Sequence, residues 1–285
     1  MLHRVLRMGA EMESSAAECQ GAQRKLSNFL ACEFDSVPTP RAARAGWRSL
    51  GARGLRGMRR ALPQACALCA ARCGDTLLCQ ACAGALPWIR SACPLCALPT
   101  VAAAVCGACT ARAPPFAGTV AAWRYAFPAD RLLQAFKYGG RLALAEPLAD
   151  ALVDAVRRRG APLPDAIVAL PLAPARQRLR GFNQAHEIAR RVASSLGVGL
   201  QRGLVRVHDA APQAGLALDA RIRNVRNAFA AKPGMSGRRI AIVDDVMTTG
   251  ATLAAAALAV RRAGATAVEA WVVARTPPPG QFAGP

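Results

Sequence analysis

Four Cys-x2-Cys pairs constrain the fold of this chain more than any other feature of its sequence. The eight cysteines are Cys66, Cys69, Cys79, Cys82, Cys93, Cys96, Cys106 and Cys109. Nine residues separate the first pair from the second, nine separate the third from the fourth, and each cysteine of the first set recurs 27 positions later. This pattern indicates an internal duplication of one small module. Four thiolates at such spacing are typical of a tetrahedral zinc site, which stabilises a module with little core.

We therefore expect two closed zinc sites, each with a structural role. Pairing along the sequence places the first four cysteines on one ion and the last four on the other. A cross-braced arrangement, in which the first pair joins the third, is the alternative. Disulfides are disfavoured in a cytoplasmic protein, and an iron–sulfur or decayed site stays as a further alternative. Cys73 breaks the repeat and is expected to be a spare thiol.

A strand–loop–helix junction carries the clearest functional signal. The apolar run 239–243 ends in Asp244 and Asp245, and an Ala-rich helix is predicted over 249–263. The junction contains Thr248, Thr249, Gly250, Ala251 and Thr252. Free N–H groups and the positive end of the helix dipole favour an anion there, and Gly250 lets the backbone approach it closely. The two carboxylates suit the hydroxyl groups of a ribose, because ligands of open α/β sheets bind at this edge.

Predicted strands and helices alternate along most of the chain, which indicates a mainly parallel sheet covered on both faces. Strands are expected at 119–127, 165–170, 239–243 and 267–273, and helices at 143–159, 184–196 and 249–263. The predicted domains are a disordered or loosely structured basic arm (1–60), a Cys-rich module (63–112), an α/β domain (119–275) and a flexible tail (276–285). An apolar content of 53% is sufficient for a hydrophobic core.

The charge balance predicts an anionic partner or substrate. The formal net charge is +20, and only Lys25, Lys137 and Lys232 are lysines among the 37 basic residues. Arginine binds phosphate in a bidentate manner, although a genome that prefers arginine codons is an alternative explanation. The longest clean apolar run, 251–260, is far shorter than the roughly 18 residues that cross a bilayer, and no apolar signal segment is evident. We expect a cytoplasmic protein without membrane insertion.

The junction sequence Asp-Asp-Val-x-Thr-Thr-Gly-Ala-Thr resembles the phosphoribosyl-pyrophosphate (PRPP) loop of type I phosphoribosyltransferases. Two other segments, 136–141 (Phe-Lys-Tyr-Gly-Gly-Arg) and 181–184 (Gly-Phe-Asn-Gln), help to decide which family of this class the chain resembles. With the cysteine module in front, the chain is similar over about residues 63–275 to the ComF family, whose members join a double zinc ribbon to a phosphoribosyltransferase domain. The resemblance implies an α/β fold of the type I phosphoribosyltransferase class.

The resemblance also implies roles for individual residues. Asp244 and Asp245 are implied to hold the ribose hydroxyls, together with a Mg²⁺ ion that bridges to pyrophosphate. Residues Thr248 to Thr252 are implied to hold the 5′-phosphate, and the segment 170–173, with Pro171 and Leu172, to receive pyrophosphate. Further phosphate contacts are expected from Arg176, Arg178, Arg180 and Lys137, with Arg141 near the same edge. A solvated loop is the plain alternative for the three arginines, and Gln213, Arg221 and Asn224 are as compatible with a structural role as with a ligand role.

Three functions fit these residues. The first is transfer of ribose 5-phosphate from PRPP to an unknown acceptor, with a loop at 208–220 or 176–180 closing over the site. No residue stands out as a base for the acceptor, which keeps two alternatives open: a single-stranded DNA-binding module, and a PRPP-sensing regulator with a partner docked on the ribbons. The family implies a role in DNA uptake and natural transformation, with a competence helicase or recombination mediator as a candidate partner.

Overall fold

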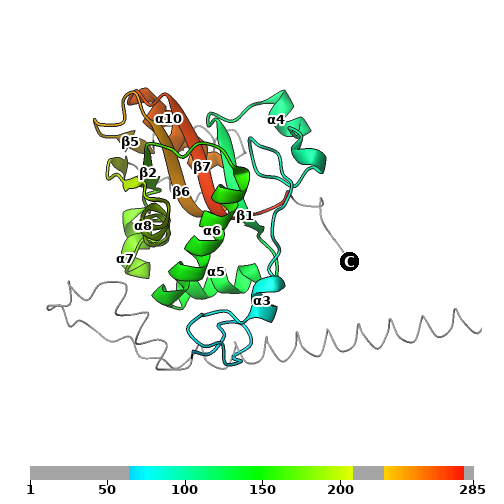
Figure 1. The fold of residues 1–285 in the computed structure, drawn as a ribbon. Helices are drawn as coiled ribbons and strands as arrows, with labels where there is room; N and C mark the ends of the chain where they lie inside the picture. The colour runs from blue at the N-terminus through cyan, green and yellow to red at the C-terminus, as the bar shows by residue number, and fades with distance from the viewer. Residues whose placement is uncertain (1–63, 208–227, 279–285) are drawn as a thin grey trace, which may run out of the picture. The chain divides into compact units, whose positions relative to one another are not determined.

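The computed structural model describes residues 64–207 and 228–278 (Figure 1). The chain divides into two compact units, Met1–Cys82 and Ala83–Pro285. The basic arm 1–60, the closing segment 208–220, the three polar residues Gln213, Arg221 and Asn224, and most of the tail lie outside the described residues. Within the described ranges, every helix falls short of the length and hydropathy that a membrane span requires.

A five-stranded sheet forms the centre of the second unit (Figure 1). Its strands are β1 (Gly118–Arg124), β2 (Ala166–Ala169), β3 (Gly199–Leu200), β6 (Arg239–Met247) and β7 (Ala267–Arg275). Their order is β1-β7-β6-β2-β3, and every neighbouring pair is parallel. The predicted α/β class with a parallel sheet is therefore confirmed.

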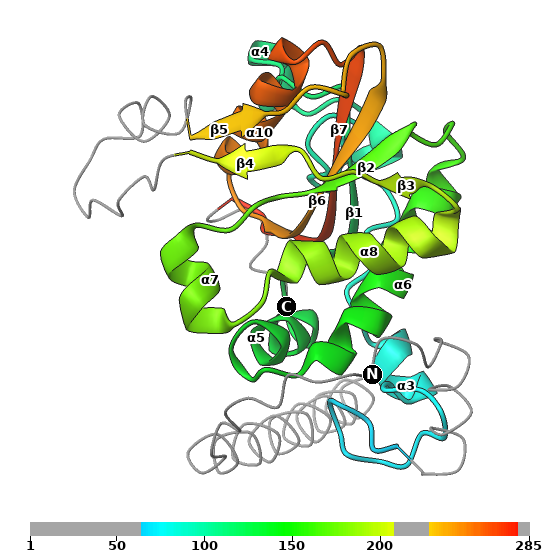
Figure 2. The same ribbon diagram turned by 90° about the vertical axis from the view of Figure 1, so that its left-hand side faces the viewer.

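Helices cover both faces of this sheet (Figure 2). On one face, α6 (Ala145–Arg159) and α8 (Gln184–Leu196) contact each other and the strands, and α10 (Ala251–Arg262) lies against β6 and β7 on the opposite face. Burial on both faces explains why β6 and β7 are nearly continuous apolar runs.

Smaller elements complete the two units. They are α3 (Gln80–Gly84), η1 (Val101–Ala103), α4 (Gly107–Ala111), α5 (Ala129–Tyr138), η2 (Leu142–Leu144) and α7 (Pro174–Arg180). A separate antiparallel pair is formed by β4 (Leu204–Arg206) and β5 (Phe229–Ala231).

Local sequence signals explain the helix ends. The side chain of Asn183 caps α8 by accepting a hydrogen bond from the backbone N–H of His186 at 3.2 Å. Gly197 ends α8 in the left-handed region with a φ of 69°, as expected for a residue without a Cβ. The predicted helix over 184–196 is therefore confirmed at both ends.

Two expectations were wrong in ways that bear on the site. The strand predicted to end at Val243 continues to Met247, because Asp244 pairs with Val272 and Val246 with Ala274 of β7. The segment 176–180, expected to be a loop, belongs to the helix α7. Pro174 at its first turn and Gly181 at its end are typical helix boundaries.

Candidate functional site

A pair of carboxylates lies near the end of the β6 ladder. The backbone N–H of Asp245 donates a hydrogen bond of 2.8 Å to Oδ1 of Asp244. Burial, and then the charge of Asp245, raise the pKa of Asp244 to about 8. Two adjacent negative charges are therefore unfavourable here, and the arrangement favours a cation or hydroxyl donors as its occupant.

Two cationic side chains from other elements face this pair. Nζ of Lys137, in the last turn of α5, lies 3.2 Å from Oδ1 of Asp245, and both side chains are largely buried. Lys137 and Arg180 each lower the pKa of Asp244 by their charge, although burial and Asp245 outweigh them. The structure thus brings Lys137 and Arg180, two of the residues predicted for phosphate, to the acid pair.

Two residues that hold Arg180 were not predicted as site residues. The guanidinium donates to Oε1 of Gln184 at 3.2 Å and to the hydroxyl of Tyr138 at 3.4 Å, and it lies 5.1 Å from the centre of the Tyr138 ring. Gln184 is only 2% exposed, and its Nε2 finds no hydrogen-bond partner among the described residues. The sequence did contain a signal for both residues. Tyr138 and Gln184 belong to the segments 136–141 and 181–184, on which the resemblance to the ComF family rests.

Gly250 shapes the loop that follows β6. Its φ is 81°, and a Cβ at this position would lie 2.5 Å from Cε of Met247. The residue therefore has to be glycine if the chain is to turn into α10 without displacing Met247. Oγ1 of Thr249 accepts a hydrogen bond of 3.3 Å from the N–H of Ala251. Thr248 and Thr249 are exposed, and the first turn of α10 offers further N–H groups to an anion.

The segment 170–173 lies beside the end of β6, as its predicted role requires. The N–H of Leu170 donates to the carbonyl of Val243 at 2.9 Å, and Nδ2 of Asn183 donates to the carbonyl of Leu170 at 3.1 Å. Pro171 and Leu172 follow as partly buried residues. The backbone of this segment is thus held at the same edge of the sheet as the acid pair.

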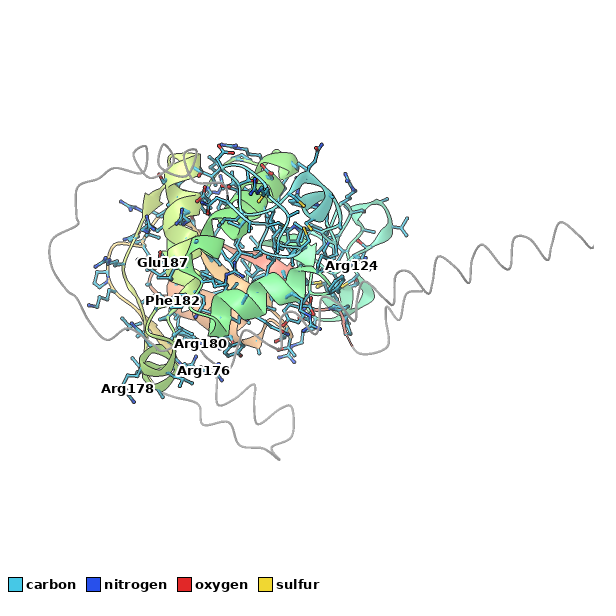
Figure 3. All side chains as sticks on the ribbon, turned by 90° about the horizontal axis from the view of Figure 1, so that it is seen from below. Arg124, Arg176, Arg178, Arg180, Phe182 and Glu187 are labelled. Carbon is cyan, nitrogen blue, oxygen red and sulfur yellow. The ribbon has the colours of Figure 1, made fainter. Side chains whose placement is uncertain are left out.

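Arg176 and Arg178 differ from Arg180 in their surroundings. All three belong to α7, but Arg176 and Arg178 are exposed, whereas Arg180 is partly buried next to Tyr138. Figure 3 shows the three side chains, with Arg178 at the outer edge of the helix. Their predicted contacts with phosphate stay a prediction, as do the roles of the acid pair and the loop.

The eight cysteines form two separate clusters. Cys66, Cys69, Cys79 and Cys82 form the first, and Cys93, Cys96, Cys106 and Cys109 form the second, with all Sγ atoms of each cluster within 4.8 Å of one another. Pairing along the sequence is therefore confirmed, and the cross-braced alternative is wrong. The Sγ atoms lie 3.7 Å apart for Cys69 and Cys79, and 3.6 Å apart for Cys96 and Cys106. A tetrahedron with Zn–S bonds of about 2.3 Å has edges of about 3.8 Å, so both clusters fit zinc.

The duplication extends to the backbone. The N–H of Cys66 donates to the carbonyl of Ala71 at 2.7 Å, and the N–H of Cys93 donates to the carbonyl of Leu98 at 2.8 Å. Ala70 and Ala97 occupy equivalent positions and have φ values of 60° and 56°. Each module therefore forms the same tight turn behind its first cysteine pair.

The thiols of each cluster ionise unequally. Burial acts to raise the pKa of Cys66, but backbone N–H groups outweigh it and lower that pKa to about 6. Burial raises the pKa of Cys82 in the same cluster. Since four neighbouring thiolates repel one another, a bound dication is what allows all of them to ionise.

Comparison with known proteins defines the class first. Residues 58–110 match the double zinc ribbon domain, and residues 181–280 match the phosphoribosyl transferase domain. The protein therefore joins a double zinc ribbon to a phosphoribosyltransferase fold of type I.

The relatives define the family. DNA utilization protein YhgH of Salmonella typhi is 37% identical over 170 residues, which are 58% of this chain and 75% of the relative. Competence protein F of Haemophilus influenzae is 35% identical over 159 residues, which are 53% of this chain and 69% of the relative. The chain belongs to the ComF family, as its resemblance implied.

More distant matches are limited in extent. Adenine phosphoribosyltransferase of Mycobacterium avium is 62% identical over 39 residues, 14% of this chain and 22% of that protein. Among solved structures, glutamine PRPP amidotransferase from B. subtilis is 20% identical with a TM-score of 0.35, covering 49% of this chain and 30% of that one. At this TM-score the match adds nothing to the evidence for the fold.

The first prediction concerns metal content. The purified protein is expected to contain two zinc ions per chain, because the structure has two clusters of four cysteines with tetrahedral dimensions. Cys69→Ser and Cys96→Ser are each expected to lose one ion, as measured by elemental analysis. Visible absorption of an iron–sulfur cluster, or thiol counts that indicate disulfides, would contradict this assignment.

The second prediction concerns the stability of the acid pair. Asp244→Asn is expected to stabilise the ligand-free protein by about 1 kcal/mol, because it removes one of two adjacent carboxylates. Chemical unfolding without ligand measures this change. Asp154→Asn, at an exposed position of α6, serves as the control and is expected to change stability by less than about 0.5 kcal/mol. Destabilisation by Asp244→Asn would mean that the charged pair is held by favourable contacts.

Proposed function

We propose that this protein binds PRPP at the carboxyl end of β6. The observation that carries the proposal is the convergence of opposite charges there. Asp244 and Asp245 from β6 face Lys137 from α5 and Arg180 from α7, next to a glycine-containing loop that begins α10. A molecule with a diol and two phosphate groups matches both signs of charge, and the ends of an open α/β sheet are where such ligands bind.

Each part of PRPP has a matching part of the site in this proposal. The loop from Thr248 to Thr252 receives the 5′-phosphate on its N–H and hydroxyl groups. Asp244 and Asp245 accept hydrogen bonds from the ribose hydroxyls. Lys137 and Arg180 approach the pyrophosphate, which lies along the segment 170–173.

The acid pair also suits a magnesium ion. Carboxylate oxygens are its usual protein ligands. Burial, and then the charge of Asp245, raise the pKa of Asp244, and a bound cation would favour its charged form. Asp244 and Asp245 would hold the ion directly or through water. When bound, Mg²⁺ neutralises part of the pyrophosphate charge. Arg180 is oriented for the same task by Gln184 and Tyr138.

We base the proposed cellular role on the names of the relatives. Two relatives bear the names DNA utilization protein and competence protein. We place this protein in the cytoplasm, in the handling of DNA that enters the cell, with a helicase or recombination mediator as its protein partner. Turnover of PRPP requires an acceptor, and the described part of the site offers groups that suit PRPP rather than a group that activates an acceptor.

The third prediction tests the PRPP site. Calorimetric titration of PRPP with Mg²⁺ into the zinc-loaded protein is expected to show binding. The double variant Asp244→Asn/Asp245→Asn is expected to lose about 100-fold in affinity, because it removes two charged hydrogen-bond acceptors. Asp154→Asn, exposed on α6, is the matched control. A folded wild type that does not bind, or equal binding by the double variant, would refute the proposal.

A second function rests on the exposed side of α7. Arg176 and Arg178 are exposed there, Leu179 of the same helix is 84% exposed, and Tyr138 of α5 is 69% exposed. Arginines bind a nucleic-acid backbone, and an exposed aromatic ring stacks on a base without sequence preference. Such a surface suits single-stranded DNA. The PRPP site would then either be separate from this surface or bind phosphate groups of the DNA.

The fourth prediction tests this surface. Arg176→Gln/Arg178→Gln is expected to weaken binding of a fluorescent oligothymidine. The slope of log K against log salt is expected to fall by about 0.7 for each phosphate that the variant no longer neutralises. Lys232→Gln/Arg238→Gln removes the same charge from exposed positions elsewhere in this unit and is expected to leave the slope unchanged. Equal effects of the two double variants would show that only the net charge matters.

A further inference from the structure

A single buried arginine connects the second cysteine cluster to the loop 248–252. Arg275, the last residue of β7, is 6% exposed. Its Nε donates a hydrogen bond of 2.8 Å to the backbone carbonyl of Cys96. Its Nη1 donates to the carbonyl of Met247 at 3.1 Å, to that of Thr276 at 2.7 Å and to that of Thr248. One guanidinium thus binds both a cysteine of the second cluster and the start of the loop.

The charge of Arg275 has no carboxylate to balance it within the described ranges. Its acceptors there are backbone carbonyls, and none of the ion pairs in this part of the chain includes it. A zinc ion with four thiolates carries about two net negative charges. An unpaired charge is costly to bury. Burial lowers the pKa of Arg275, and the nearby charges of Cys96, Cys109 and Cys106 act in the opposite direction.

The contacts of Arg275 also set the direction of the loop N–H groups. A trans peptide is planar, so its carbonyl and its N–H point in opposite directions. When Arg275 holds the carbonyls of Met247 and Thr248, the N–H groups of Thr248 and Thr249 point away from it. These N–H groups belong to the loop that receives phosphate in the proposed function.

We propose that Arg275 is a positioning residue that makes the conformation of the loop 248–252 depend on the metal in the second cluster. Without zinc, the turn that contains Cys96 is no longer held by the metal. The carbonyl of Cys96 then loosens, and with it the guanidinium that donates to it and to the loop. That PRPP affinity depends on zinc rests on the proposed function. That the order of the loop depends on zinc does not rest on it.

The duplication supplies a matched pair of variants. Cys79 and Cys106 occupy equivalent positions in the two modules. Arg275 donates to the carbonyl of Cys96, which belongs to the same module as Cys106. In the full chain, without PRPP, Cys106→Ser is expected to lose one zinc ion and to increase hydrogen exchange of peptides spanning 247–253 by about tenfold, as expected when one hydrogen bond to a charged group is removed. Cys79→Ser is expected to lose one ion with exchange of the same peptides unchanged.

Substitution of the arginine tests the link from the other side. Arg275→Lys keeps the charge but cannot reach all four carbonyls. It is expected to increase exchange of the loop and to accelerate release of one of the two zinc ions to a chelator, whereas general destabilisation would accelerate both. Unchanged loop exchange in Cys106→Ser after loss of its zinc, or faster release of both ions in Arg275→Lys, would overturn the proposal.

The same samples separate this inference from the proposed function. If the wild type fails to bind PRPP but hydrogen exchange of the loop still increases in Cys106→Ser, the positioning role is supported and the PRPP site is refuted. If the wild type binds PRPP while loop exchange ignores the second cluster, the PRPP site stands and the positioning role is refuted.

Discussion

Parallel pairing of β6 between β2 and β7 is the constraint on which the rest of the site depends. Parallel strands end at the same edge, so the segments that follow all three strands are brought together there. The segment 170–173 follows β2, the loop 248–252 follows β6, and Thr276 follows β7. The N–H of Thr276 donates to the carbonyl of Met247 at 2.9 Å. The sheet order therefore selects which parts of the sequence act together, and the helices α5 and α7 add the opposing charge.

Much of the site could be predicted because its signals are local. Cysteine spacing predicts two metal sites, but it leaves open whether the pairs join along the sequence or across it. The structure shows that Cys93, Cys96, Cys106 and Cys109 form one cluster. The strand–loop–helix junction likewise needs only one contiguous segment, in which Gly250 is demanded by its positive φ. Lys137 and Arg180 were found through family resemblance, since charge alone does not single them out in a chain with 37 basic residues.

The remaining features depend on pairing between distant segments. The extension of β6 to Met247 follows from its register with β7, which no local pattern specifies. Polar residues such as Asp244 usually indicate a strand end, and here the ladder continues through them. Arg275 is the clearest case: a lone arginine at the end of a strand carries no motif, and its importance arises from four carbonyls that the fold gathers around it.

The order of the strands has a consequence for synthesis on the ribosome. β1 precedes most of the α/β domain, yet it pairs with β7, with Gly118 opposite Glu269. Closing so long a loop is slow and is opposed by chain entropy. The second cysteine module, by contrast, is closed by short-range contacts and can fold on metal as soon as Cys109 has emerged. If this module folds first, β1 stays unpaired until β7 has been made, and Arg275 reaches the loop 248–252 only after that.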